Sequence, residues 1–181
     1  MRFWLAVLSA LVLAVGLVAC DTDDDGWNPE AQFAPVKRPA FGARETDGKL
    51  VIWVPPGCVG VWSVKLMFGL SGPDLVLTPT VGTVSFDRFT VGGPYPPGMA
   101  VTKAPPPDFD WRTVDTLHLD VGTTPGGFPS TSVVADIVES SGDHPDNTFF
   151  FDGVGWLDPE GVAARIGNDF EGVCTPQETR G

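Results

Sequence analysis

Residues 58–68, CVGVWSVKLMF, decide the fold class. Apolar and polar side chains alternate along this segment: Trp62, Val64, Leu66 and Phe68 share one phase, and Ser63 and Lys65 share the other. Successive side chains of a β-strand point to opposite faces of the sheet, so a period of two predicts a half-buried strand. We therefore expect residues 58–68 to form a strand with Trp62 in the core.

The residues before this segment predict a β-hairpin. Residues 41–45 and 49–54 flank the turn Thr46-Asp47-Gly48, and Asp-Gly readily adopts the positive φ angles of a tight turn. Pro55-Pro56-Gly57 follows and is rich in turn formers, so we expect it to end the second strand of the hairpin.

Six further apolar runs are candidate strands, separated by turns rich in Gly, Pro and Asp. They are residues 74–78, 81–86, 98–103, 113–121, 131–139 and 148–151. Short strands at this spacing predict an all-β fold, an antiparallel β-sandwich of the Ig-like or jelly-roll kind. One short C-terminal helix is expected over residues 159–166, because Asp158 is a good N-cap and Pro159 suits the first helical position. A strand over the same residues is the alternative.

The composition limits the partners of the chain. Its 181 residues include 23 acidic and 11 basic side chains, which give a formal net charge of −12. This charge repels phosphate, so it argues against nucleic acid and against anionic lipid headgroups as partners. An apolar content of 43% is too high for a disordered chain, and 22 Gly and 18 Pro fit a domain with many turns.

The start of the chain has the layout of a secretory signal. Residues 3–19 are uncharged and largely apolar, and Arg2 precedes them. A transmembrane helix needs about 20 apolar residues, slightly more than this run provides. We expect residues 1–19 to be a signal peptide.

The end of this run, Leu17-Val18-Ala19-Cys20, resembles the lipobox of bacterial lipoproteins: an aliphatic residue, a permissive position, a small residue and a cysteine. The resemblance covers residues 1–20 only. It implies that Cys20 receives a diacylglyceryl group and becomes the first residue of the mature protein. Two or more acyl chains would anchor it stably to the cell membrane, on the extracytoplasmic face. The alternative is a plain signal anchor with a chance cysteine.

The acidic segment after Cys20 has two interpretations. Asp21, Asp23, Asp25 and Gly26 match the first half of a calcium-binding EF-hand loop, which needs a bidentate Glu at position 12. That position is Gln32, a poor ligand, so we interpret the segment as a solvated tether. The chain then divides into a signal peptide (1–19), a lipidated cysteine with an acidic, Pro-rich tether (20–39), and a β-domain (40–181).

Two cysteines remain in the expected exported domain, Cys58 and Cys174. An even number of cysteines in an oxidising compartment predicts a disulfide between them. Two unpaired, buried thiols are the alternative, because spacing alone does not show contact.

The histidines offer little for metal chemistry. His118-Leu119-Asp120 with a later His144 resembles the HxD…H triad of non-haem iron oxygenases. Ordinary strand alternation with a solvated face explains His118 and Asp120 equally well. Acidic residues around His144 are typical of a turn, although they could bind a cation. We predict no metal, no cofactor and no catalytic residue.

One loop is a candidate binding patch. Phe109 and Trp111 lie within PPPDFDW, beside Asp108 and Asp110. Exposed aromatic side chains combine apolar area with a polar handle, and they are enriched where proteins bind partners. The alternative is that the two rings cap one end of the sandwich.

These features predict a membrane-anchored envelope lipoprotein whose extracytoplasmic β-domain binds a protein or a cell-wall glycan. A lipid-anchored secreted hydrolase with an unrecognised active site is the alternative. Serine hydrolase motifs are missing: Gly69-Leu70-Ser71-Gly72-Pro73 lacks the last glycine of a nucleophile elbow.

Overall fold

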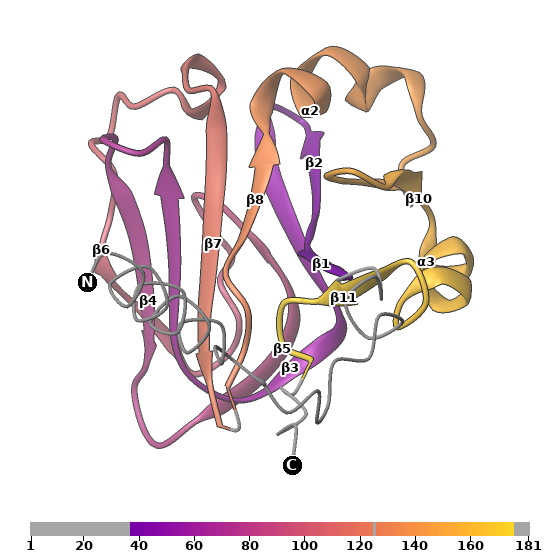
Figure 1. Cartoon of the computed structure of the whole chain (residues 1–181). Coiled ribbons are helices and arrows are strands. Elements are labelled where there is room, and N and C mark those ends of the chain that lie inside the picture. The colour runs from indigo at the N-terminus through magenta and orange to yellow at the C-terminus, as the bar shows by residue number, and fades with distance from the viewer. Residues whose placement is uncertain (1–36, 125, 176–181) are drawn as a thin grey trace, which may run out of the picture. The chain divides into compact units, whose positions relative to one another are not determined.

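Figure 1 shows the computed structural model of the chain, which describes residues 37–124 and 126–175. The strands are β1 (Arg38–Ala40), β2 (Gly42–Thr46), β3 (Lys49–Phe68), β4 (Asp74–Pro79), β5 (Val84–Thr90), β6 (Met99–Lys103), β7 (Thr116–Thr123), β8 (Ser130–Val133), β9 (Phe149–Phe151), β10 (Gly155–Leu157) and β11 (Phe170–Gly172). The strands pair antiparallel, apart from the β1–β11 pair. The predicted all-β class is confirmed, and the β-sandwich arrangement, of the Ig-like or jelly-roll kind, stays a prediction.

Short helices fill some of the connections. They are the α-helices α2 (Val134–Ser140) and α3 (Pro159–Arg165) and the 3₁₀-helices η2 (Trp111–Thr113) and η3 (Ser141–Asp143). None of the helices in the described ranges is long and apolar enough to span a membrane. The C-terminal helix is present as expected, and the Asp158 carboxylate caps it by accepting a hydrogen bond of 2.7 Å from the Gly161 N–H.

The long strand β3 organises the sheet (Figure 1). Its first residues pair with β2 and β5, whereas its last residues pair with β4 and β7. The first part continues outward to β9 and β10, and the second part to β6 and β8. One strand therefore joins two groups of strands, and apolar side chains from both groups form one core cluster.

The predicted stop at Pro55-Pro56-Gly57 is wrong, because β3 continues through these residues. The strand accommodates them by bulging instead of ending. Its register with β5 shifts between Trp53 and Cys58 and again between Cys58 and Val61. Gly57 and Gly60 have φ angles of 113° and 63°, which glycine adopts without a steric penalty. β-Bulges bend a strand and increase its twist, so the Pro-Gly segment forms the bend of β3.

The expected burial of Trp62 is also wrong, because the bulges change the period of burial. Cys58, Val61 and Val64 are buried, at intervals of three residues, whereas Trp62 is 56% exposed. A third register shift, against β7, falls between Val61 and Ser63. An extra residue at a bulge moves the following side chains to the opposite face.

Two clusters of buried apolar side chains stabilise the domain. The larger one contains Leu50, Ile52 and Val54 from β3 together with residues of β4 and β7. The smaller one contains Trp53 from the opposite face of β3, packed against Phe149 at a ring-centroid distance of 5.2 Å. The first part of β3 is therefore covered on both faces.

The other predicted elements differ mainly at their ends. The hairpin over residues 41–54 is confirmed: Thr46 pairs with Lys49, and Asp47 and Gly48 have the positive φ angles expected of the turn. The strand expected over 131–139 is wrong beyond Val133, where α2 begins and buries Val134 and Ile137. β5 lies at 84–90 instead of 81–86, and β1 begins at Arg38, two residues before the expected start of the domain.

Candidate binding groove

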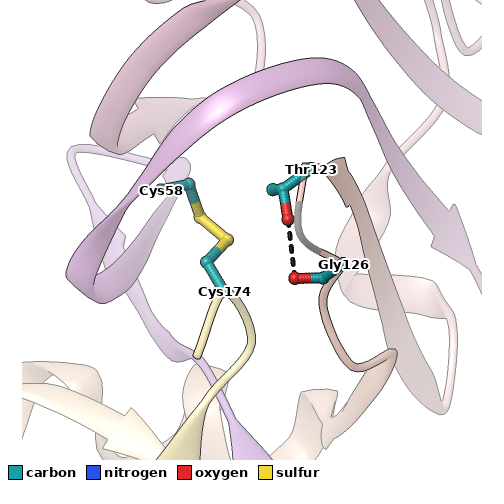
Figure 2. The surroundings of a disulfide bond; sticks show 4 residues. All are labelled: Cys58, Thr123, Gly126 and Cys174. Atoms are coloured by element: carbon teal, nitrogen blue, oxygen red, sulfur yellow. Dashed lines mark hydrogen bonds between the residues drawn. A yellow bond between two sulfur atoms is a disulfide. The ribbon is translucent and has the colours of Figure 1, made fainter. Parts of the chain in front are cut away.

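The predicted disulfide between Cys58 and Cys174 is present, as Figure 2 shows. The two Cα atoms lie 5.2 Å apart, within the usual range for such a bond. Beside the bond, the Thr123 hydroxyl donates a hydrogen bond of 2.7 Å to the Gly126 carbonyl at the end of β7. The disulfide therefore ties the bend of β3 to the segment that follows β11.

The predicted patch loop turns its aromatic rings inward. Trp111 is only 6% exposed and belongs to the larger core cluster. Phe109 is half-buried, and its ring meets Phe68 edge-on at a centroid distance of 5.0 Å. Asp108 and Asp110 remain exposed at the surface. The carboxylates and the rings of this loop therefore face different surroundings.

Both aromatic residues line one side of an open cavity of about 290 Å³, which we call the binding groove. One part of the lining, the patch side, consists of Ala104, Pro105, Pro106, Pro107, Phe109 and Trp111, and the other part consists of Gly48, Lys49, Leu50, Val91, Gly92 and Tyr95. Proline and aromatic side chains lose little conformational entropy when a ligand contacts them. The lining therefore combines stiff proline and aromatic side chains with polar groups, and Lys49 is its charged member.

Arg112 holds the two sides of the binding groove together. Its guanidinium donates two hydrogen bonds to the Glu45 carboxylate, of 3.1 and 2.8 Å, and one of 2.8 Å to the Gly48 carbonyl at the hairpin turn. It also donates to Asp110 at 3.1 Å and lies 5.3 Å from the centre of the Trp111 ring. A planar guanidinium suits this two-pronged binding of a carboxylate.

These contacts shift two pKa values in directions that favour the charged forms. Hydrogen bonds from Arg112 to Glu45 and then to Asp110 raise the pKa of the guanidinium above its usual range. The backbone N–H of Arg112, which Asp110 accepts at 3.1 Å, lowers the pKa of the Asp110 carboxyl, and the guanidinium adds to this effect. The charged forms of Asp110 and Arg112, which flank the lining residue Trp111 in the chain, are thus favoured.

The indole of Trp111 carries an unusual donor. Its Nε1 atom is buried and has no hydrogen-bond partner within residues 37–124 and 126–175. An unpaired buried donor costs about 1–3 kcal/mol, and native folds contain few of them.

A second cavity, of about 480 Å³, lies beside the hairpin turn and includes the carboxylates of Glu45, Asp47 and Asp146. Glu45 is bound to Arg112, and Asp146 lies 3.1 Å from the Arg44 guanidinium. Each of these two carboxylates is thus engaged by an arginine.

The acidic segment around His144 forms a turn around a buried arginine. Arg44 is 4% exposed and donates to the carbonyls of His144, Pro145 and Thr148 at 3.2, 2.8 and 3.2 Å. The His144 ring stacks on Trp156 at 4.4 Å. Backbone carbonyls of this segment thus bind a guanidinium.

His118 is engaged with hydroxyl groups on the solvated face of β7. Its ring nitrogens lie 3.0 Å from the Thr116 hydroxyl and 2.9 Å from the Thr131 hydroxyl. The part of the chain that the structure describes contains no group of three or more His, Cys, Asp or Glu side chains placed to hold a metal ion.

Sequence reasoning missed several lining residues. In the sequence, Pro105, Pro106 and Pro107 indicate only a turn. Nothing around Tyr95 indicates that it lines the same groove as these prolines. Arg112 did carry a signal, because an arginine beside Trp111 and Asp110 can stack on one and pair with the other. Cys20 and the acidic segment after it lie outside the described residues.

Comparison of the chain with protein-family models, with curated proteins and with solved structures found no match.

Proposed function

We propose that this protein is a lipid-anchored lipoprotein of the cell envelope whose β-domain binds a protein partner in the binding groove. The groove itself carries the proposal: it is open, its lining is more apolar than polar and includes three prolines and three aromatic rings, and charged residues are the chain neighbours of its lining residues. Binding sites combine apolar and aromatic lining with a few fixed polar groups in this way. The anchor rests on the Leu-Val-Ala-Cys junction at residues 17–20.

The lining favours a protein over a glycan. Glycans need several hydrogen-bonding groups, whereas prolines 105–107 contribute no N–H and the Tyr95 hydroxyl already accepts a hydrogen bond from the Gly92 N–H at 3.2 Å. An apolar side chain on a partner would bury area against the prolines and aromatic rings. The exposed Asp108, which lies in the chain between the lining residues Pro107 and Phe109, favours a basic residue beside that side chain.

The anchor is tested by processing and mass. Cys20→Ala should leave the precursor uncleaved, and the mature wild type should carry a diacylglyceryl mass on Cys20. An unmodified Cys20 in membrane-bound wild type would contradict the anchor without affecting the groove.

The groove is tested by crosslinking in intact envelopes, followed by mass spectrometry of the captured chains. Pro106→Glu places a charge in the exposed part of the lining, and Pro129→Glu makes the same change at an exposed proline outside it. We expect Pro106→Glu to lose the captured protein at least tenfold and Pro129→Glu to retain it, with equal melting temperatures. Equal capture by both variants, or retention of glycan fragments alone, would contradict the proposal.

A further inference from the structure

The bend of β3 presents apolar side chains to the surface. Pro56, Val59 and Trp62 lie at intervals of three residues and are exposed, with fractions of 65% for Val59 and 56% for Trp62. We call these three residues the apolar ridge. Cys58 and Val61, which lie between the ridge residues in the chain, are buried. The bulges therefore direct Cys58 and Val61 into the core and the ridge residues to the surface.

Glycines lie next to the apolar ridge, and because they have no side chains they leave the ridge residues uncovered. A Cβ atom placed on Gly122 of β7 would lie 2.6 Å from the Trp62 ring, so the indole lies directly against this backbone. Gly57 and Gly60 separate the ridge residues along β3. One side of the indole is thus supported by the sheet, while more than half of the side chain stays accessible.

The two chain segments that carry the apolar ridge and Gly122 contain long stretches without charged side chains. The sequence has no Asp, Glu, Lys or Arg from residue 50 to 64 or from residue 121 to 135. Asp87 of β5 is the charged residue beside the ridge glycines: its Cβ atom would lie 3.7 Å from a Cβ atom placed on Gly57. In a chain of net charge −12, residues 50–64 and 121–135 thus offer no charge to desolvate, and Asp87, which is 64% exposed and lies 3.9 Å from Arg88, is the charge that the contact must leave in water.

The chain enters the domain close to this bend. β1, which begins one residue after the first described residue, pairs with β11. A Cβ atom on Gly172 of β11 would lie 2.1 Å from the Pro55 carbonyl oxygen, and Cys174 is bonded to Cys58. Figure 1 shows β1 and β11 beside the lower, bent part of β3. The apolar ridge and the N-terminal end of the domain therefore lie on neighbouring elements.

We infer that the apolar ridge contacts the headgroup–acyl boundary of the membrane that holds the protein, an inference that rests on the proposed anchor at Cys20. Sixteen residues, 21–36, separate Cys20 from Lys37. A coil of this length spans roughly 20–24 Å and reaches about 55 Å when extended. Tethering at this range makes contact with the bilayer intramolecular, so a weak interfacial preference suffices.

Tryptophan supplies that preference. Its ring is enriched at the membrane interface, where one part is apolar and the N–H stays hydrated. Val59 and Pro56 add apolar area on the same edge, and none of the three residues requires a headgroup charge. The contact orients the domain, and the lipid on Cys20 provides the affinity.

The experiment uses the full mature, lipidated protein in phosphatidylcholine vesicles, with and without lipids brominated near the headgroup. Bromine quenches indoles at that depth, so a Trp27→Phe background removes the indole of the segment next to the anchor. Trp53 and Trp111 are buried and Trp156 is half-buried, which leaves Trp62 as the most exposed indole of the domain. We expect brominated lipid to lower the fluorescence of this background, and Trp62→Phe to remove at least half of the difference.

Two further variants keep the result interpretable. Leu70→Ser changes an apolar side chain that is 90% exposed beyond the other end of β3, and it should leave the quenching unchanged. Val59→Asp leaves Trp62 in place and should reduce its quenching at least twofold, even if Trp62→Phe folds poorly.

Quenching that is the same with and without Trp62 in lipidated protein would overturn the inference. Protection of Trp62 from aqueous acrylamide without vesicles would do the same, because it would indicate a protein contact. Intact mass of the same samples reports the lipid on Cys20, so failure of the anchor and failure of the ridge are read separately.

Discussion

The indole of Trp62 lies against the backbone of Gly122 on the neighbouring strand, at a distance that leaves no room for a Cβ atom. The contact follows from the bulges in β3, which turn Trp62 outward and over β7. An aromatic ring packed over a cross-strand glycine compensates for the missing side chain of the glycine. Trp62 is therefore exposed and structural at the same time.

Gly122→Ala should destabilise the domain by about 1–3 kcal/mol, the usual cost of overpacking. The new Cβ would meet both the Trp62 ring and the Ser63 hydroxyl oxygen, at 2.6 and 2.7 Å. Urea unfolding of Gly122→Ala, Trp62→Ala and the double variant measures the coupling. We expect the double variant to lose less stability than the sum, because removing the indole relieves one of the two clashes. Additive losses would show that the ring does not bear on Gly122.

Arg112→Lys should weaken the connection between the hairpin turn and the patch loop. A lysine cannot reach the Glu45 carboxylate, the Asp110 carboxylate and the Gly48 carbonyl at once, as the guanidinium does. We expect a loss of about 1 kcal/mol in unfolding free energy, together with weaker partner binding, because both sides of the groove depend on this residue.

Arg165→Lys is the matched control for this prediction. Its partner Asp169 is four residues away on the exposed surface, at 2.7 Å. Pairs of this kind contribute about 0.3–0.5 kcal/mol. An equal loss in the two variants would contradict a special role for Arg112.

The Cys58–Cys174 disulfide closes a loop with a sequence separation of 116 residues. Replacing both cysteines with Ala should lower the unfolding free energy by about 4–5 kcal/mol in the chain-entropy account, which is an upper guide. The measurement is urea unfolding of the double variant against the oxidised wild type. A reductant should destabilise the wild type and leave the variant unchanged, and a variant as stable as the wild type would contradict the prediction.

Local signals in the sequence were sufficient wherever a few neighbouring residues decide the backbone. Asp47-Gly48 specifies the hairpin turn, and Asp158-Pro159 specifies the start of α3, through turn and capping chemistry that acts within four residues. The cysteine pair was predictable because only two cysteines remain after Cys20.

At the bend of β3, pairing with strands distant in the sequence overrides the local sequence signal. A Pro-Pro-Gly segment normally ends a strand, but here β5 pairs with β3 both before it, at Trp53, and after it, at Cys58, and the bulges that result invert the phase of Trp62. The strand prediction over residues 131–139 was wrong for a different reason. The apolar residues there also fit a helical period, since the buried residues Val134 and Ile137 lie three residues apart. The binding groove needs Tyr95 and Pro106 from separate loops, which no local pattern brings together.

The ion pairs of Asp74 should make the stability of the domain depend on pH. The Asp74 carboxylate lies between Lys103 at 3.0 Å and Lys65 at 3.6 Å, and so connects β4 to β6 and β3. The hydrogen bond from Lys103 is the main cause that lowers the pKa of this carboxyl below its ordinary value of 3.8, with charge attraction from both lysines in addition. The Asp74 side chain is 17% exposed, but the side chains of Lys65 and Lys103 are 43% and 59% exposed, so water screens both ion pairs.

Because the folded pKa is lowered, the pair stabilises the native state above pH of about 4, and this contribution disappears as the pH falls through the folded pKa. Asp74→Asn should therefore be less stable than wild type at pH 7, by up to about 1 kcal/mol, and equal to it near pH 2. Thermal unfolding between pH 7 and pH 2 measures the difference. Lys103→Met should show the same dependence, and a difference that persists unchanged at pH 2 would mean that Asp74 acts through packing instead of charge.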